Sequence, residues 1–197
     1  MEYKITAPVS GEGLELLREL RAGDTVLLSG TVFTARDQAH KRMSECIENG
    51  EPLPFELRGS AIYYVGPTPE RAGSAIGSAG PTTSGRMDSY SPNLLDLGNR
   101  IMIGKGKRNE AVRQAIIRNG AVYLGALGGA GALMAGCVKE CKIVAWEDLG
   151  CEAVRRLRVE DMPLTVVIDS EGRDLYREGP EEYLASLDGS PEGVPEI

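Results

Sequence analysis

The chain has 197 residues, of which 42% are hydrophobic and only 5% aromatic, so it can bury one good-sized core of aliphatic side chains and is not a disordered chain. Its formal net charge is −7 and it has no basic stripe, a combination that argues against nucleic-acid binding. No apolar run reaches the roughly 18 residues of a membrane span, and the first residues lack the pattern of a secretory signal, so we expect a cytoplasmic protein without membrane contact.

Strands and helices are predicted to alternate in the first part of the chain. Runs of apolar and β-branched residues indicate strands, and leucines on one helical face indicate the first helix. The expected strands are 2–6, 25–33 and 60–65, and the expected helices are 11–20 and 35–48. The stretch from Gly66 to Gly85 is crowded with glycine, proline, serine and threonine. Because a long loop inside a compact domain is usually functional, we expect this stretch to form part of a functional site.

The second half alternates more regularly and predicts an α/β fold in a single domain. The expected strands are 100–103, 121–125, 142–146 and 164–169. The expected helices begin near Ser91 and cover 108–118, 129–136 and 150–157. Residues 179–197 are acidic and rich in glycine and proline, so we expect a flexible C-terminal tail there.

A first group of polar residues lies where the strand 25–33 runs into the next helix. Thr34 and Asp37 could form a variant of a capping box, which is a purely structural role. That role does not explain Arg36, because a cation near a helix N-terminus is unfavourable unless an anion is present. His40, the only histidine, lies one turn beyond Arg36 and suits either a ligand site or a partly buried helix position.

A second group follows Gly80-Pro81, where Thr82 and Thr83 precede Arg86. Backbone amides in such a loop can hold an anion, although the spacing alone favours an ordinary glycine-rich turn before a helix. A third signal is Lys105, which stands between two glycines at a predicted strand end. A solvated surface lysine is the alternative there.

Arg36, Arg86 and Lys105 together make a cationic set in an acidic protein. All three follow predicted strands or glycine turns. Because arginine binds carboxylates in a bidentate manner, the set suits a small dicarboxylate.

The cysteines and the remaining glycines give weaker signals. The four cysteines are expected to be thiols rather than disulfides, and the spacing of Cys137 and Cys141 fits neither a CxxC motif nor a zinc finger; the four are Cys46, Cys137, Cys141 and Cys151. The glycine cluster at 128–131 lacks the full dinucleotide-binding pattern, so close helix packing explains it better than a phosphate loop.

The polar segments resemble one known family. The runs SGTVFTARDQAHKR, YYVGPTP, SAGPTTSGRMDSY and MIGKG are similar to the β subunit of class I fumarases and L-tartrate dehydratases. The later runs GGAGALMA, WEDLG, VEDMP and VVIDSEG fit as well. The resemblance implies a swivelling β/β/α domain, a mixed sheet with flanking helices, over residues 1–178.

The resemblance also implies a reaction and a partner. The family hydrates fumarate reversibly to (S)-malate with a [4Fe–4S] cluster, whose open iron acts as a Lewis acid. The cluster belongs to the α subunit, so none of the four cysteines of this chain is implied as a ligand and no metal site is expected in it. The implied assembly is α2β2. The chain should then expose an apolar patch where the α subunit docks, and the isolated chain could pair with a second copy through that patch.

Residue roles follow from the matched motifs. Arg36, Arg86 and Lys105 are implied to bind the substrate carboxylates. Thr82 matches the proposed catalytic base, and Thr83 is implied to assist through its backbone amide. Supporting roles are implied for two further residues, Asp37 and His40.

Other functions stay open at this stage. An L-tartrate dehydratase β subunit would use the same chemistry on a substrate with one more hydroxyl. A non-catalytic subunit that binds the dicarboxylate or only caps its partner is the alternative from a different class. The cationic set argues against a passive cap.

Overall fold

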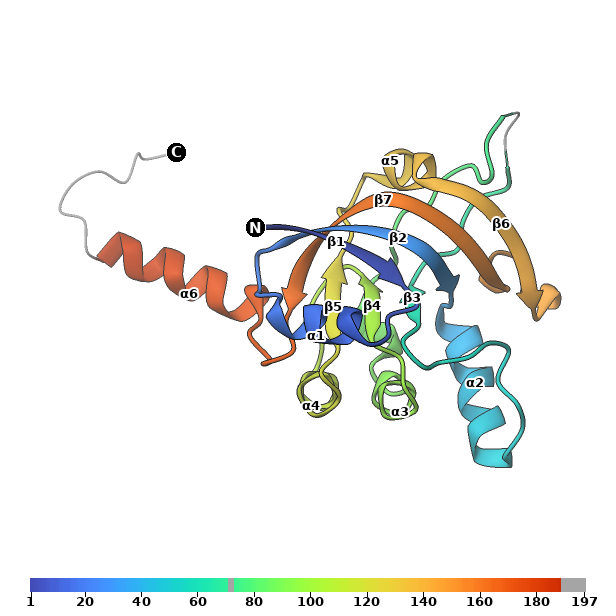
Figure 1. The fold of residues 1–197 in the computed structure, drawn as a ribbon, viewed down its shortest axis with the longest axis horizontal. Coiled ribbons are helices and arrows are strands. Elements are labelled where there is room, and N and C mark those ends of the chain that lie inside the picture. The colour runs from blue at the N-terminus through green and yellow to red at the C-terminus, as the bar shows by residue number, and fades with distance from the viewer. Residues whose placement is uncertain (71–72, 189–197) are drawn as a thin grey trace.

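Strands and helices alternate along most of the chain in the computed structural model, which describes residues 1–70 and 73–188 (Figure 1). The strands are β1 Glu2–Ala7, β2 Thr25–Thr34, β3 Ala61–Tyr63, β4 Ile101–Gly104, β5 Val122–Gly125, β6 Val138–Ala145 and β7 Val154–Ile168. The α-helices are α1 Glu12–Glu19, α2 Asp37–Asn49, α3 Ser91–Asp96, α4 Glu110–Asn119, α5 Gly131–Gly136 and α6 Leu175–Asp188. Two 3-10 helices complete the set, η1 Ser84–Met87 and η2 Glu147–Glu152.

The strands form one mixed sheet in the order β1-β2-β3-β4-β5-β7-β6. Neighbours from β1 to β5 are parallel, whereas β7 runs antiparallel to β2, β5 and β6. Because β7 pairs with both β2 and β5, the pairings of β2, β3, β4, β5 and β7 close on themselves. In Figure 1 the long strands β2, β7 and β6 arch over the short parallel strands, with α3 and α4 on the far side of those strands. The expected α/β domain with a mixed sheet and flanking helices is confirmed.

The short parallel strands are buried on both faces, and each face contributes to a different core. Ile101 and Ile103 of β4 pack into the core enclosed by the sheet. Met102, between them, packs into a second core that includes residues of α2, α3 and α4. Parallel strands covered on both faces read as continuous apolar runs rather than alternating ones, which is the pattern of this segment.

One predicted helix is wrong. The segment 150–157 was expected to be helical, but η2 ends at Glu152 and β7 begins at Val154. The first half of β7 pairs with β2 on one edge and with β6 on the other. These cross-strand hydrogen bonds, together with the burial of Leu157 and Val159, outweigh the local helix propensity of the segment.

The capping-box alternative for Thr34 and Asp37 is not the arrangement found. Arg36 occupies the N-cap position of α2, and its own side chain accepts no capping hydrogen bond. The buried Thr34 hydroxyl instead accepts the Arg155 amide at 3.0 Å and lies 3.3 Å from the Ala153 carbonyl. The Thr34 hydroxyl, which the capping-box pattern assigned to helix α2, therefore bonds to β7 instead.

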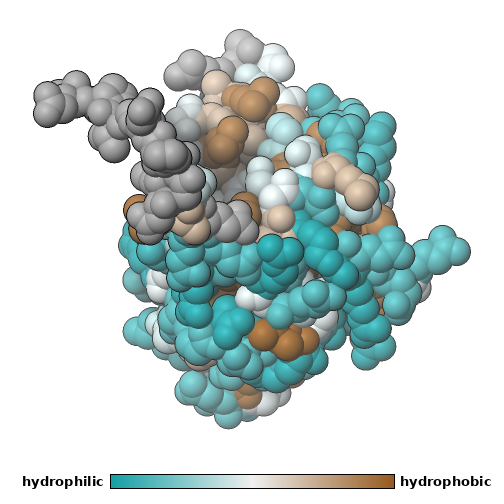
Figure 2. All heavy atoms as spheres, turned by 90° about the vertical axis from the view of Figure 1, so that its left-hand side faces the viewer, coloured by the Kyte–Doolittle hydropathy of each residue, from teal (hydrophilic) through white to brown (hydrophobic). Residues whose placement is uncertain are grey.

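Helix α6, at the C-terminal end of the described residues, projects from the body of the molecule (Figure 1). The boundary expected at residue 178 falls inside α6, and residues 189–197 of the expected tail lie outside the described residues. Figure 2 views the molecule from the side of α6, and most of that face is hydrophilic with small hydrophobic patches. Within the described residues, no helix is both long and apolar enough to span a bilayer.

Candidate active site

The predicted site residues lie at the carboxyl ends of three adjacent parallel strands. Arg36 and Asp37 follow β2 directly, and Lys105 follows β4. Between them, the Thr82 amide donates to the Tyr64 carbonyl at 2.8 Å, one residue past β3. This edge of a parallel sheet is the usual location of ligand sites in α/β proteins.

The loop from Gly66 to Thr83 leaves β3 and returns to the same edge. Within it, the Gly77 amide donates to the Thr68 carbonyl at 3.1 Å, and the buried Tyr63 hydroxyl donates to the Ala79 carbonyl. A Cβ on Gly131 of α5 would come within 2.5 Å of Ser78 Oγ and 3.1 Å of the Gly80 amide nitrogen, so this part of the loop lies against the helix. Close packing is thus seen at Gly131, whereas a Cβ on Gly128 or Gly129 would meet nothing within 4 Å.

The returning chain pairs with the lysine turn after β4. Thr83 and Lys105 form an isolated parallel bridge, and the Ser84 amide donates to the Lys105 carbonyl at 2.9 Å. The Thr82 hydroxyl makes no hydrogen bond within residues 1–70 and 73–188, and the Thr83 side chain is exposed. The two threonines and the lysine predicted from separate motifs are thus brought together.

Arg36 lies between a carboxylate and a glycine. One guanidinium nitrogen is 3.4 Å from the Glu152 carboxylate, which also accepts the Gln38 amide at 3.0 Å. A Cβ on Gly66 would come within 2.9 Å of Arg36 Nη1, so the glycine is what leaves space for the guanidinium. Arg36 Nε is buried and has no hydrogen-bond partner among the described residues. Glu152 explains why a cation is tolerated at the start of α2. Its carboxylate neutralises the charge of Arg36 and also accepts the Gln38 amide of the helix.

Asp37 and Arg86 connect the first turn of α2 to η1. Asp37 Oδ2 lies 2.7 Å from Arg86 Nη2, with the arginine side chain 51% exposed and the aspartate 21%. Although the atoms are close, they are not aligned for a hydrogen bond, and Asp37 Oδ2 accepts none from the described residues. Arg86 is therefore oriented by a charge contact while remaining open to solvent.

His40 is a buried helix residue behind Arg36. It is 1% exposed, its Nδ1 lies 3.0 Å from the Arg36 carbonyl, and its ring meets the Tyr64 ring edge-on at 5.3 Å. Burial lowers the pKa of His40 to about 4, so the imidazole is neutral at pH 7. Because the Arg36 carbonyl can only accept, Nδ1 carries the proton, and Nε2 is left without a partner in the described residues. Of the two readings of this histidine, the geometry agrees with the buried one.

Lys105 borders a cleft of about 510 Å³. Apolar side chains including Leu127, Val167 and Leu175 line part of it, and Thr83 lies at its edge. The Tyr176 hydroxyl, also in the lining, accepts the Gly106 amide at 3.1 Å. Within the described part of the chain, the Lys105 ammonium has no ion-pair partner, which leaves its charge available to a ligand.

Sequence reasoning missed three charged residues that support the site. Glu152 holds Arg36, and a buried ion pair joins Arg108 to Asp88 at 2.6 Å. Asp88 lies in the matched SAGPTTSGRMDSY run, but its partner is on another segment, so its role is not visible in either segment alone. The one signal available was an arginine at the first position of a predicted helix, 108–118.

The residues of this chain do not fit an iron–sulfur cluster. No group of three or more histidine, cysteine, aspartate or glutamate side chains in the described residues is placed to hold a metal. All four cysteines are free thiols; they lie on α2 (Cys46), at the end of α5 (Cys137), on β6 (Cys141) and on η2 (Cys151).

Comparisons with known proteins match nearly the whole chain. A family model described as "Fumarase C-terminus" matches residues 6–179. The chain is 43% identical over 166 residues to "Fumarate hydratase 2" of Leishmania major, a match that covers 81% of this chain and 28% of that protein. It is 39% identical to "Fumarate hydratase class I, aerobic" of Escherichia coli K12, over 85% of this chain and 31% of that protein.

A third relative differs from these in length. The chain is 38% identical over 168 residues to "Putative L(+)-tartrate dehydratase subunit beta" of Methanocaldococcus jannaschii, which covers 82% of this chain and 86% of that protein. The chain therefore spans less than a third of each of the two fumarate hydratases but most of the β subunit.

Proposed function

The chain belongs to the fumarase C-terminus family, and from that premise we propose that it is the β subunit of a heteromeric [4Fe–4S] hydro-lyase that interconverts fumarate and (S)-malate. The β-subunit reading rests on the relative from M. jannaschii, since a chain of similar extent carries that name. The substrate rests on the fumarate hydratases and on the cationic set at the edge of the sheet.

The observation that carries the proposal is the placement of Arg36, Arg86 and Lys105 on segments that meet at one edge of the sheet, with the backbone of Thr82 bonded to the chain just past β3. Arg36 and Arg86 each have a carboxylate neighbour, Glu152 and Asp37, whereas Lys105 has no ion-pair partner among the described residues. Arg86 is exposed and Lys105 is partly exposed, and two arginines and a lysine match the two carboxylates of a dianion. We propose that all three bind substrate carboxylates.

The proposed chemistry assigns the proton transfer to Thr82. In the dehydration of malate, the Thr82 Oγ removes a proton from C3, the C–O bond at C2 breaks, and hydroxide leaves. Negative charge builds on the carboxylate next to C3, and cations aimed at that carboxylate stabilise the transition state more than the ground state. The Thr83 amide, which donates no hydrogen bond within the described residues, is proposed as a further donor to the same charge.

A threonine hydroxyl needs help to act as a base, because it is far from ionised at neutral pH. No carboxylate of the described residues hydrogen-bonds to Thr82, so we propose that the α subunit supplies the group that accepts its proton. The same subunit is proposed to carry the cluster, which the residues of this chain do not fit. His40 and Asp37 keep supporting roles, His40 by holding the Arg36 backbone and Asp37 by orienting Arg86.

L-Tartrate dehydration is the second candidate, and the name of the M. jannaschii relative favours it. Tartrate has one more hydroxyl than malate. A site rejects the analogue strongly only where it hydrogen-bonds that group. The contacts that would decide the substrate are proposed to lie in the partner.

Turnover by the assembled enzyme tests the proposal. We would co-express the chain with its cognate α subunit, assemble the cluster without oxygen, and follow fumarate absorbance from malate with L-tartrate in parallel. Malate turnover that requires both chains is the expected result, with an α2β2 mass. Tartrate turnover alone would change the substrate and keep the mechanism. Activity on neither, with the cluster intact, would overturn the enzyme reading in favour of a binding or capping subunit.

A further inference from the structure

Arg108 is a cation buried without contact with solvent, just behind the candidate site. Its side chain is 0% exposed, and it lies between β4 and α4. Its Nε donates to Asp88 Oδ1 at 2.6 Å, and its Nη2 donates to Ser91 Oγ at 2.7 Å. The guanidinium also lies over the rings of Tyr64 and Tyr123, at 5.3 and 5.1 Å from their centroids. Every described contact of this charge is therefore internal.

Asp88 uses both carboxylate oxygens to hold the same segment. Besides Arg108, it accepts the Asn109 amide on Oδ2 at 2.6 Å. Ser91 completes the connection, since its hydroxyl accepts from Arg108 and donates to the Met87 carbonyl at 2.9 Å. The turn from Met87 to Ser91 is thus tied to residues 108–109 by two oxygen atoms of Asp88 and by Ser91.

These bonds connect the two segments that carry the proposed ligand groups. Thr82, Thr83 and Arg86 precede Asp88 on one segment, and Lys105 precedes Arg108 by three residues on the other. In front, Thr83 and Lys105 form a backbone bridge. Behind it, the Tyr123 hydroxyl lies 2.9 Å from Ser84 Oγ and donates to the Gly106 carbonyl at 3.0 Å.

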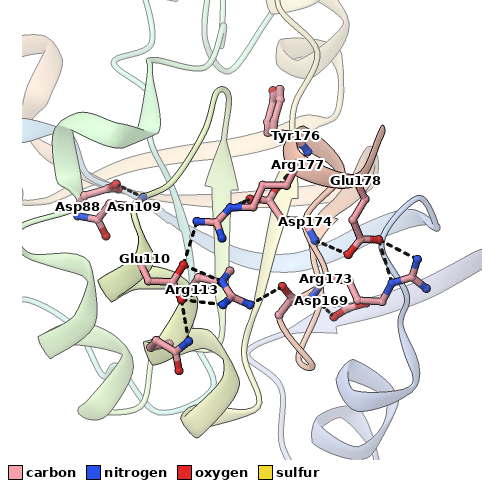
Figure 3. A network of polar contacts seen from close by, with 12 residues as sticks. Asp88, Asn109, Glu110, Arg113, Asp169, Arg173, Asp174, Tyr176, Arg177 and Glu178 are labelled. Carbon is pink, nitrogen blue, oxygen red and sulfur yellow. Dashed lines mark hydrogen bonds and ion pairs between the residues drawn. The ribbon is translucent and has the colours of Figure 1, made fainter. Parts of the chain in front are cut away.

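The more exposed contacts around the lysine turn are weaker. Figure 3 shows the link from Asp88 to Asn109 and, beyond it, Glu110 accepting from Arg113 and from Arg177 of α6. These carboxylates and guanidinium groups are partly or largely exposed, and exposed ion pairs contribute little. Among the ion pairs around the lysine turn, the buried one is therefore best able to add to the backbone bridge in fixing the relative position of the two segments.

A buried ion pair is not required for stability, because well-packed apolar residues of similar volume serve equally well. What the pair adds is specificity of alignment. Each buried charge needs its partner, and the partners meet in only one register of the two segments. A displacement of about 1 Å at reacting groups can cost about 100-fold in rate. We propose that Arg108 is a positioning residue of the active site, whose ion pair with Asp88 sets the register of Thr82 and Arg86 against Lys105. This inference rests on the proposed function.

The test compares variants of the assembled two-subunit enzyme. Arg108→Met combined with Asp88→Asn removes both charges without leaving either one unpaired, and the asparagine can still accept the Asn109 amide. Arg108→Lys keeps the charge but cannot bind Asp88 and Ser91 as a fork. Leu17→Ala is the matched control, since Leu17 is fully buried on α1, away from these contacts.

The expected result is a loss in kcat without a matching change in KM. Per assembled complex, the double variant should lose about 100-fold in kcat with KM within about threefold, and Arg108→Lys should recover part of the loss. Leu17→Ala should keep nearly normal kcat at a comparable fall in melting temperature. A double variant that keeps the wild-type kcat, or loses no more than Leu17→Ala does, would overturn the proposal.

A second readout is independent of turnover. The Ser84 amide donates to the Lys105 carbonyl, so its hydrogen exchange reports the register directly. In the double variant, the Ser84 amide should exchange at least about tenfold faster than in wild type. In Leu17→Ala, the exchange rate of this amide should rise no more than the rates of core amides do. If the wild-type complex turns over neither malate nor tartrate, the proposed function fails, and unchanged Ser84 protection would separately overturn the positioning role.

Discussion

Asp37 Oδ2 and Arg86 Nη2 lie 2.7 Å apart and join helix α2 to the 3-10 helix η1. Because the arginine is half exposed, the pair itself contributes only about 0–1 kcal/mol. A substrate carboxylate can therefore take over the guanidinium at little cost. Asp37 orients Arg86, while the proposed ligand competes for it.

Removing each partner of this pair should have unequal effects. Arg86→Met deletes a charged hydrogen bond of about 1.5–3 kcal/mol, so we expect kcat/KM for malate to fall about 10- to 150-fold. Asp37→Asn removes only the orienting charge and should change kcat/KM less than about fivefold. Steady-state kinetics of the assembled enzyme measures both. Equal losses in the two variants would contradict the assignment of Arg86 to the substrate.

Thr82 and Thr83 provide a matched pair for the proposed proton transfer. Thr82→Ala should lower kcat by about 100- to 10,000-fold with a small change in KM, because general-base catalysis contributes about that much. Thr82→Ser keeps the hydroxyl and should recover most of the rate. Thr83→Ala keeps the backbone amide to which its role is assigned, so it should stay close to wild type. Near-normal turnover of Thr82→Ala would remove this residue from the mechanism.

Gly66 should be needed for the position of Arg36. A Cβ at this residue would meet Arg36 Nη1 at 2.9 Å and the Cys151 carbonyl at 3.0 Å. In Gly66→Ala we expect a loss of about 1–3 kcal/mol in the free energy of unfolding, because overpacking displaces neighbours, and at least about a tenfold loss in kcat/KM.

Gly136→Ala is the control for this substitution, because a Cβ there meets nothing within 4 Å. Urea unfolding of the chain and kinetics of the assembled enzyme check both quantities. If Gly66→Ala and Gly136→Ala have the same free energy of unfolding and the same kcat/KM, the close approach of Arg36 to Gly66 does not matter for function.

His40 should make the folded chain sensitive to mild acid. Burial lowers its pKa to about 4, whereas the unfolded value is about 6.5. Between about pH 4 and pH 6.5, His40 therefore binds a proton in the unfolded state but not in the folded state. This contribution is complete above pH 6.5 and falls as the pH drops to 4, by on the order of 3 kcal/mol.

Urea titrations at pH 7.0, 5.5 and 4.5 measure this dependence. His40→Gln cannot titrate in this range and should show a flatter decline in the free energy of unfolding than wild type. Parallel declines in the two proteins would mean that the acid sensitivity belongs to other groups. Kinetics are not needed for this comparison, so it can be made on the isolated chain.

The alternation of strands and helices was predictable because it depends on local periodicity. The apolar run at Ile101–Ile103 and the leucines of α1 encode their elements within a few residues. The helix predicted for 150–157 was wrong because strand β7 is stabilised by pairing with β2 and β6, and most of these partner residues are distant in sequence. Likewise, Thr34 matched a helix cap locally but is used by the neighbouring strand.

The family and the residue types of the candidate site can be recognised in the amino-acid sequence alone, because Arg36, Thr82, Arg86 and Lys105 stand in long matched runs, each at a strand end or glycine turn. That they share one edge follows from parallel strands, whose carboxyl ends lie on the same side of a sheet. Tertiary structure alone decided which carboxylate neutralises which cation. Glu152 with Arg36, Asp37 with Arg86 and Asp88 with Arg108 are contacts across the fold. Charge pairing depends on distance and burial, and neither is encoded in the local pattern of a segment.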